Sequence, residues 1–196
     1  MAQLSRFTLS ACATALVLSL GTAAHAHLIT PFICTPSGTA DGTSRWVNSG
    51  GVLLNQFTTV QNGESTTGLT LSDIDSNSQM NQATLEFDIR GTANLTNGPW
   101  VYAIGTDQNG NSLVYAAAMA NAKKVRTISG GWTGTLGKTQ FGVPSGTKMT
   151  VSEFVIQNFP SATKSSTQLF GMRVNGLTLV PVLSTKQTCP AGDVHP

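Results

Sequence analysis

The chain has few charged side chains, and this scarcity argues against functions that depend on a strong electrostatic field. Only 10% of its 196 residues are Asp, Glu, Lys or Arg, and the formal net charge is +2. A typical soluble domain carries roughly 25% charged residues. Lys123, Lys124 and Arg126 form the densest positive stretch, which we interpret as a solvated turn. The sequence therefore gives no support for nucleic-acid binding.

Recognisable catalytic motifs are also lacking. There is no G-x-S-x-G nucleophile elbow, and the chain has only three histidines. Glu86 and Asp88 are close enough in sequence to suggest a glycosidase pair, but Arg90 shares their face, which favours a solvated charged surface. The sequence thus leans towards a protein that is not an enzyme.

Only one long apolar run is present, from Phe7 to Leu20. It follows Arg6 and leads to Ala24-His25-Ala26, which is the charged, apolar and small-residue order of a signal peptide. The run is shorter than the ~20 apolar residues that a membrane span needs. We predict a signal peptide over 1–26, a single mature domain over 27–196 without a membrane span, and a secreted, periplasmic or cell-surface location. Cleavage after Ala24 is the alternative.

Cysteine is scarce as well, with three in the chain. Cys12 lies inside the signal, and lipidation there would require a shorter apolar region than the one present. The mature chain keeps Cys34 and Cys189, which we expect to form one disulfide in an oxidising compartment. This bond would join the start of the domain to its end.

The remaining sequence is typical of an all-β protein. Short apolar runs alternate with Gly, Asn and Pro, which predicts a single antiparallel β-sandwich or barrel-like domain with at most one short helix. Its core is expected over roughly 50–183, with loop-like edges at 35–50 and 184–196. No fixed-period repeat is visible, which disfavours solenoids and propellers.

Several segments allow sharper predictions. Over 83–90, apolar and charged residues alternate, which is the period of a half-buried strand. The runs 100–104 and 113–116 flank Asn-Gly and predict a hairpin. Over 148–156, apolar side chains occupy both odd and even positions, which predicts a central strand covered on both faces, or a bulge near Glu153. The Ala-rich stretch 116–124 fits either a short helix or a strand end.

A copper site is one candidate for chemistry. Cleavage after Ala26 would leave His27 with a free amine and a ring nitrogen, a chelate suited to Cu(II). His195 could add a ligand if the disulfide gathers the termini, with Asp41 and Asp193 supplying oxygens. His25-Ala26-His27-Leu28 resembles the mature start of periplasmic copper-carrier proteins, which are small β-sandwiches. The N-terminal histidine is also similar to that of copper-dependent polysaccharide monooxygenases.

A calcium site is a second candidate. Asp73, Asp75 and Asn77 have the D-x-D-x-N spacing of an EF-hand loop. The loop lacks the Gly expected at its sixth position, which is Ser78, and the Glu expected at its twelfth, which is Thr84. An irregular calcium site or a polar turn with Asx hydrogen bonds are the remaining readings.

Aromatic residues make up only 7% of the chain. Trp132 lies in Ser-Gly-Gly-Trp-Thr-Gly, a context that would expose it as a sugar-binding platform. Trp100 heads an apolar strand and is expected in the core. With low charge and no catalytic motif, the sequence favours a secreted surface, fibre or matrix subunit, or a recognition module that self-assembles or binds carbohydrate or another surface ligand. Copper binding is the alternative.

Overall fold

The computed structural model describes a set of separate segments of the chain. They are residues 28–34, 42–49, 52–59, 66–74, 79–80, 83–90, 99–158, 165–178, 180–183 and 185. The predicted signal peptide lies outside them. Within these segments, no helix has the length and apolar character needed to cross a membrane.

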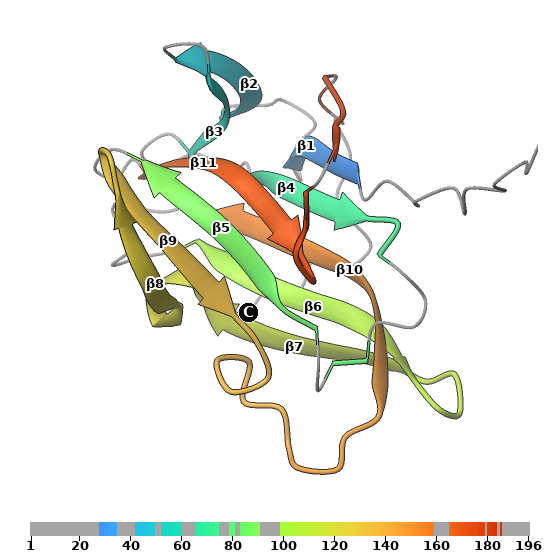
Figure 1. Ribbon diagram of the computed structural model, residues 1–196. Helices are drawn as coiled ribbons and strands as arrows, with labels where there is room; N and C mark the ends of the chain where they lie inside the picture. Colours follow the sequence, from blue (N-terminus) through green and yellow to red (C-terminus); the bar gives the residue numbers. More distant parts are fainter. Residues whose placement is uncertain are drawn as a thin grey trace, which may run out of the picture.

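Two β-sheets form the fold (Figure 1). Sheet A has the order β13-β1-β4-β10-β6-β7, and sheet B the order β2-β3-β11-β5-β9-β8, with β12 paired to β11. Sheet A comprises β1 (Leu28–Cys34), β4 (Thr66–Ser72), β6 (Trp100–Asp107), β7 (Ser112–Ala118), β10 (Met149–Asn158) and β13 (Val180–Pro181). Sheet B comprises β2 (Thr43–Ser49), β3 (Val52–Thr59), β5 (Leu85–Arg90), β8 (Lys123–Ile128), β9 (Gly131–Leu136), β11 (Ser165–Val174) and β12 (Leu177–Thr178). The predicted all-β sandwich is confirmed.

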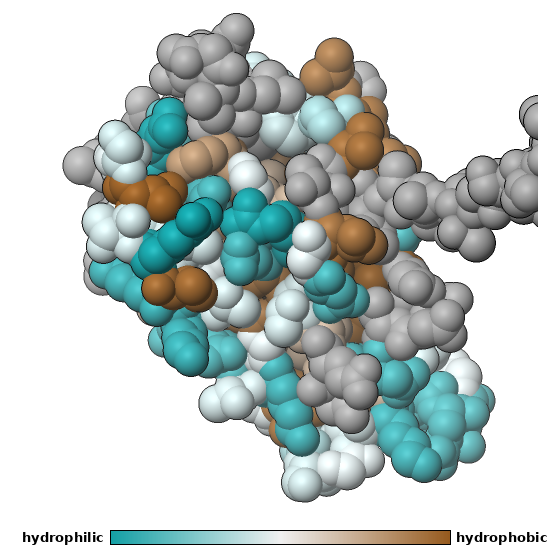
Figure 2. Space-filling view, in the orientation of Figure 1, coloured by the Kyte–Doolittle hydropathy of each residue, from teal (hydrophilic) through white to brown (hydrophobic). Residues whose placement is uncertain are grey.

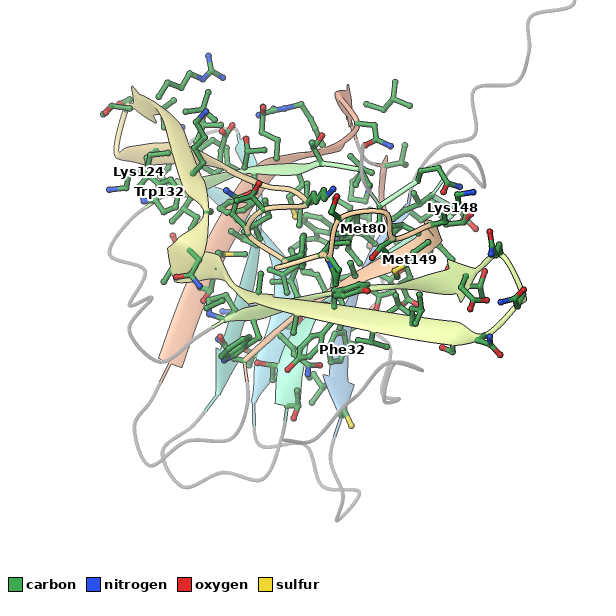
Figure 3. All side chains as sticks on the ribbon, turned by 90° about the horizontal axis from the view of Figure 1, so that it is seen from below. Phe32, Met80, Lys124, Trp132, Lys148 and Met149 are labelled. Carbon is green, nitrogen blue, oxygen red and sulfur yellow. The ribbon has the colours of Figure 1, made fainter. Side chains whose placement is uncertain are left out.

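The main core fills the space between the sheets. Leu85, Phe87 and Ile89 of β5 are buried in it, as the alternation of 83–90 predicts, while the charged residues between them point outward. Figure 3 places Met80 and Met149 in this interior and Phe32 on the opposite side of β6 and β7. Phe32 belongs to a second, smaller cluster that also includes Cys34, Tyr102 and Val155.

β10 is the central strand of sheet A. It lies between β4 and β6, and its register with β6 shifts between Val151 and Glu153. Phe154 and Ile156 face the main core, and Val155 faces the smaller cluster. The apolar side chains at both odd and even positions of this segment predicted a central strand or a bulge near Glu153, and both features are confirmed.

Some local predictions are wrong. The edge 35–50, expected as a loop, contains β2, which pairs with β3 along its whole length. The Gly-rich stretch around Trp132 is not a flexible loop but strand β9, in which Gly131 and Gly134 pair with β5. Of the two alternatives for 116–124, the strand end is the correct one: the stretch ends β7, makes the 3-10 turn η1 (Met119–Asn121) and begins β8. Pairing with β6 decides against the helix, although alanine favours one locally.

The predicted hairpin is confirmed, and Asp107 holds its turn. One oxygen of the Asp107 carboxylate accepts hydrogen bonds from the backbone amides of Asn109 at 2.8 Å and Asn111 at 2.9 Å. The other accepts one from the side chain of Asn111 at 2.9 Å. Gly110 follows in a left-handed conformation with φ 83°.

Acid is expected to loosen this turn. The Asn111 side chain, followed by backbone amides of the turn, lowers the pKa of Asp107 below its ordinary value of 3.8. A lowered pKa in the folded state means that the carboxylate stabilises the turn above that value and loses this effect as pH falls through the folded pKa. In an NMR titration, the Asn111 amide shift should have a midpoint below 3.8. The Asp107→Asn variant should abolish the transition, and a midpoint at or above 3.8 in the unsubstituted protein would contradict the assignment.

Candidate ligand-binding face

The metal candidates fall largely outside the described segments. His27, His195, Asp75 and Asn77 all lie there, so the copper and calcium hypotheses stay predictions. Asp73 directly follows β4, is exposed and has a left-handed φ of 57°. In the part of the chain that the structure describes, no group of three or more His, Cys, Asp or Glu side chains could hold a metal ion.

Cys34 ends β1 and is buried in the smaller cluster. Cys189, the partner assigned from the sequence, lies beyond the described residues, so the pairing of these two cysteines stays a prediction.

Trp132 is less exposed than the sequence predicts, and Trp100 is more exposed. Trp132 is partly buried against the main core, with its ring edge-to-face to Phe87 at 5.9 Å and the Lys124 ammonium 5.1 Å from its centroid. Trp100, expected in the core, is 41% exposed on β6, so that prediction is wrong. It points away from the core because its β6 neighbour Val101 takes the inward position.

The outer face of sheet B gathers most of the charged side chains of the strands. Residues that pair across neighbouring strands lie on the same side of a sheet, so the register arranges these side chains in rows. One row runs Phe170, Asp88, Thr133, Arg126, and the next runs Arg173, Glu86, Thr135, Lys123. Figure 2 views this face, where hydrophilic side chains gather over β5, β9 and β11.

A chain of polar contacts links four strands of this face. Arg173 of β11 makes an ion pair with Glu86 and lies 3.6 Å from the Asp88 carboxylate, both on β5. The Thr133 hydroxyl of β9 donates a 2.5 Å hydrogen bond to Asp88. Arg126 of β8 donates to the Thr133 oxygen at 3.3 Å. The charged face expected around Glu86 and Asp88 is a connected network that is solvated only in part, because Asp88 and Thr133 are buried in it.

Beside this network, the guanidinium of Arg90 lies over an aromatic ring. Its guanidinium carbon is 4.5 Å from the centroid of Phe170, a cation–π contact. The Arg90 Nε is buried and has no hydrogen-bond partner. On its other side is Gly131, where a side-chain carbon would lie only 1.8 Å from the Ile89 carbonyl oxygen. Position 131 must therefore remain glycine, so no side chain stands on the sheet next to Arg90.

A separate open hollow lies at the far end of sheet A. It is lined by the hairpin residues Asp107 and Leu113, by Tyr115, and by Thr147 and Lys148 of the loop before β10. Figure 3 shows Lys148 on the opposite side of the molecule from Lys124 and Trp132. The Asp107 carboxylate is already engaged in its turn, and the polar residues Gln108 and Asn109 complete the lining of the hollow.

The fold is similar to that of solved structures. No protein-family profile and no curated protein matches the chain. A family 30 carbohydrate-binding module has a similar fold, with a TM-score of 0.51 at 14% identity over 83% of this chain and 87% of that chain. Two structures of a family 11 carbohydrate-binding module from Clostridium thermocellum have a TM-score of 0.44. Their identities are 8% and 9%, over 79% and 78% of this chain and 89% and 91% of theirs.

Proposed function

We propose that the protein is a secreted, non-enzymatic module that recognises carbohydrate through the outer face of sheet B. The β-sandwich resembles that of a carbohydrate-binding module. The signal peptide over 1–26 and the Cys34–Cys189 disulfide, both predicted from the sequence, fit an extracellular setting.

The observation that carries the proposal is the Arg90–Phe170 stack set among the polar rows of this face. A sugar offers a ring face of C–H groups bordered by hydroxyls. The Arg90–Phe170 pair can pack against the ring face, while Glu86 and Arg126, which are accessible on the same face, can accept from and donate to the hydroxyls. Among the described residues, the outer face of sheet B supplies both kinds of surface side by side.

Removal of the Phe170 ring tests the proposal. Phe170→Ala should weaken binding to a responsive soluble polysaccharide about tenfold, which corresponds to the loss of ~1.4 kcal/mol of binding free energy. Phe170 is only partly buried, so the variant should stay folded. Affinity electrophoresis through gels containing cellulose derivatives, mixed-linked glucan, xylan or polygalacturonate would measure the effect.

Trp100→Ala provides the matched control, since it removes an exposed aromatic ring from the other sheet. It should leave the retardation in the gel unchanged. If Trp100→Ala abolished binding while Phe170→Ala did not, the site would lie on sheet A. If the unsubstituted protein bound none of the polysaccharides, carbohydrate recognition itself would be wrong.

A further inference from the structure

The strands of the two sheets carry charges of opposite sign. The cationic residues of the described strands all lie in sheet B, namely Arg45, Arg90, Lys123, Lys124, Arg126 and Arg173. The acidic residues of that sheet are Glu86 and Asp88. In the strands of sheet A the charged residues are Asp107 and Glu153, both acidic. Counted over their strands alone, one sheet is therefore basic and the other acidic, while Lys138 and Lys148 lie in the loop between β9 and β10.

The two acids of sheet B do not neutralise its other cations. Among the described residues, the ion pairs within 4.0 Å are those of Arg173 with Glu86 and Asp88. Asp88 also accepts the hydrogen bond from Thr133. Arg90 stacks on Phe170 instead of pairing with an acid, and its Nε has no hydrogen-bond partner. Arg126 is exposed and bonds to a neutral hydroxyl.

We infer that the ligand of this face is an acidic polysaccharide, one that carries carboxylate or sulfate groups along a sugar chain. This inference rests on the proposed function. A guanidinium positioned over an aromatic ring can direct two terminal N–H donors to the two oxygens of a carboxylate. The Nε of Arg90 is buried, so the terminal N–H groups of its guanidinium are the ones that would meet a carboxylate, beside Gly131 on the neighbouring strand.

The spacing of the cations also suits a polymer that carries an anionic group at regular intervals. Arg90 on β5 and Arg126 on β8 are separated by two strand spacings, on the order of 10 Å. Arg45 is exposed on β2, towards the opposite edge of the sheet. A sugar chain that lies across the strands would bring successive charged groups to separate arginines, whereas a neutral glucan would leave these cations unmatched.

The test compares three soluble polymers: polygalacturonate as the acidic sugar, mixed-linked β-glucan as the neutral sugar, and polyglutamate as an acidic chain without sugars. The unsubstituted protein should bind polygalacturonate most tightly, and added salt should weaken the binding. Arg90→Gln and Arg126→Gln should each weaken it by about tenfold. Lys148→Gln removes the same charge from the distant loop and should have no effect. Thermal melting of each variant would establish that it is folded.

The outcomes separate this inference from the proposed function. Tight binding to β-glucan that the two arginine substitutions leave unchanged would overturn the acidic ligand and keep carbohydrate recognition. Equal binding to polyglutamate and polygalacturonate would overturn both, because a general polyanion site would remain. Binding to none of the polymers would also overturn both.

Discussion

Replacing Phe154 by alanine is expected to lower the free energy of unfolding by about 3–5 kcal/mol, the range for deleting a buried aromatic ring. Phe154 is fully buried on the central strand of sheet A. Its ring stacks on Phe141, with centroids 6.0 Å apart and planes at 29°. Alanine would leave a cavity between the sheets that β10, held by strands on both sides, cannot close. Urea unfolding followed by tryptophan fluorescence would measure the loss.

Phe170→Ala is the matched control, since it removes the same ring from the outer face of sheet B. It should change stability far less than Phe154→Ala does. It should also weaken ligand binding, whereas Phe154→Ala should leave binding unchanged under conditions in which that variant is folded. A loss below about 1 kcal/mol for Phe154→Ala would contradict the described packing of the core.

Gly68→Ala is expected to be destabilising by about 1–3 kcal/mol or more, because no space exists for a methyl group. Gly68 lies in β4 opposite Phe32 of β1 and Gln157 of β10. A side-chain carbon there would lie 1.9 Å from the Ile156 carbonyl oxygen, which belongs to the backbone and cannot rotate away. The substitution would therefore push β4 and β10 apart. Differential scanning calorimetry would detect the lowered melting temperature.

Gly137→Ala controls for the intrinsic cost of replacing glycine. The nearest atom to a side-chain carbon at Gly137 is 3.7 Å away, which is an ordinary contact. This variant should melt close to the unsubstituted protein. Equal melting temperatures for the two variants would mean that the register between β4 and β10 is wrong.

The class of fold could be predicted from the sequence because local alternation is strong where one face of a strand is buried. The charged and apolar residues of 85–90 identified both faces of β5 before any partner strand was known. β2 and β9 were missed because glycine and polar residues hide their strand character. Their pairing with neighbours far along the chain, and not local preference, makes them strands.

The candidate site could be predicted only in part. Glu86, Asp88 and Arg90 were identified as one outward face, but their partners come from distant strands. Along β11, simple alternation would place Met172 on the same face as Phe170. The register shift between Phe170 and Arg173 instead buries Met172 and turns Arg173 outward, onto Glu86. A bulge of this kind changes the face of every later residue, and the local pattern does not reveal it.

The opposite charges of the two sheets have a consequence for how the molecule meets its target. Strands that are positive in one sheet and negative in the other experience a torque in an electric field, so a surface carrying the proposed acidic polysaccharide would turn sheet B towards itself before contact. At physiological ionic strength this torque acts only over the last ~8 Å of approach. Capture would then be fast in dilute media and slow in salty ones, while the time spent bound would depend on the short-range contacts of the outer face.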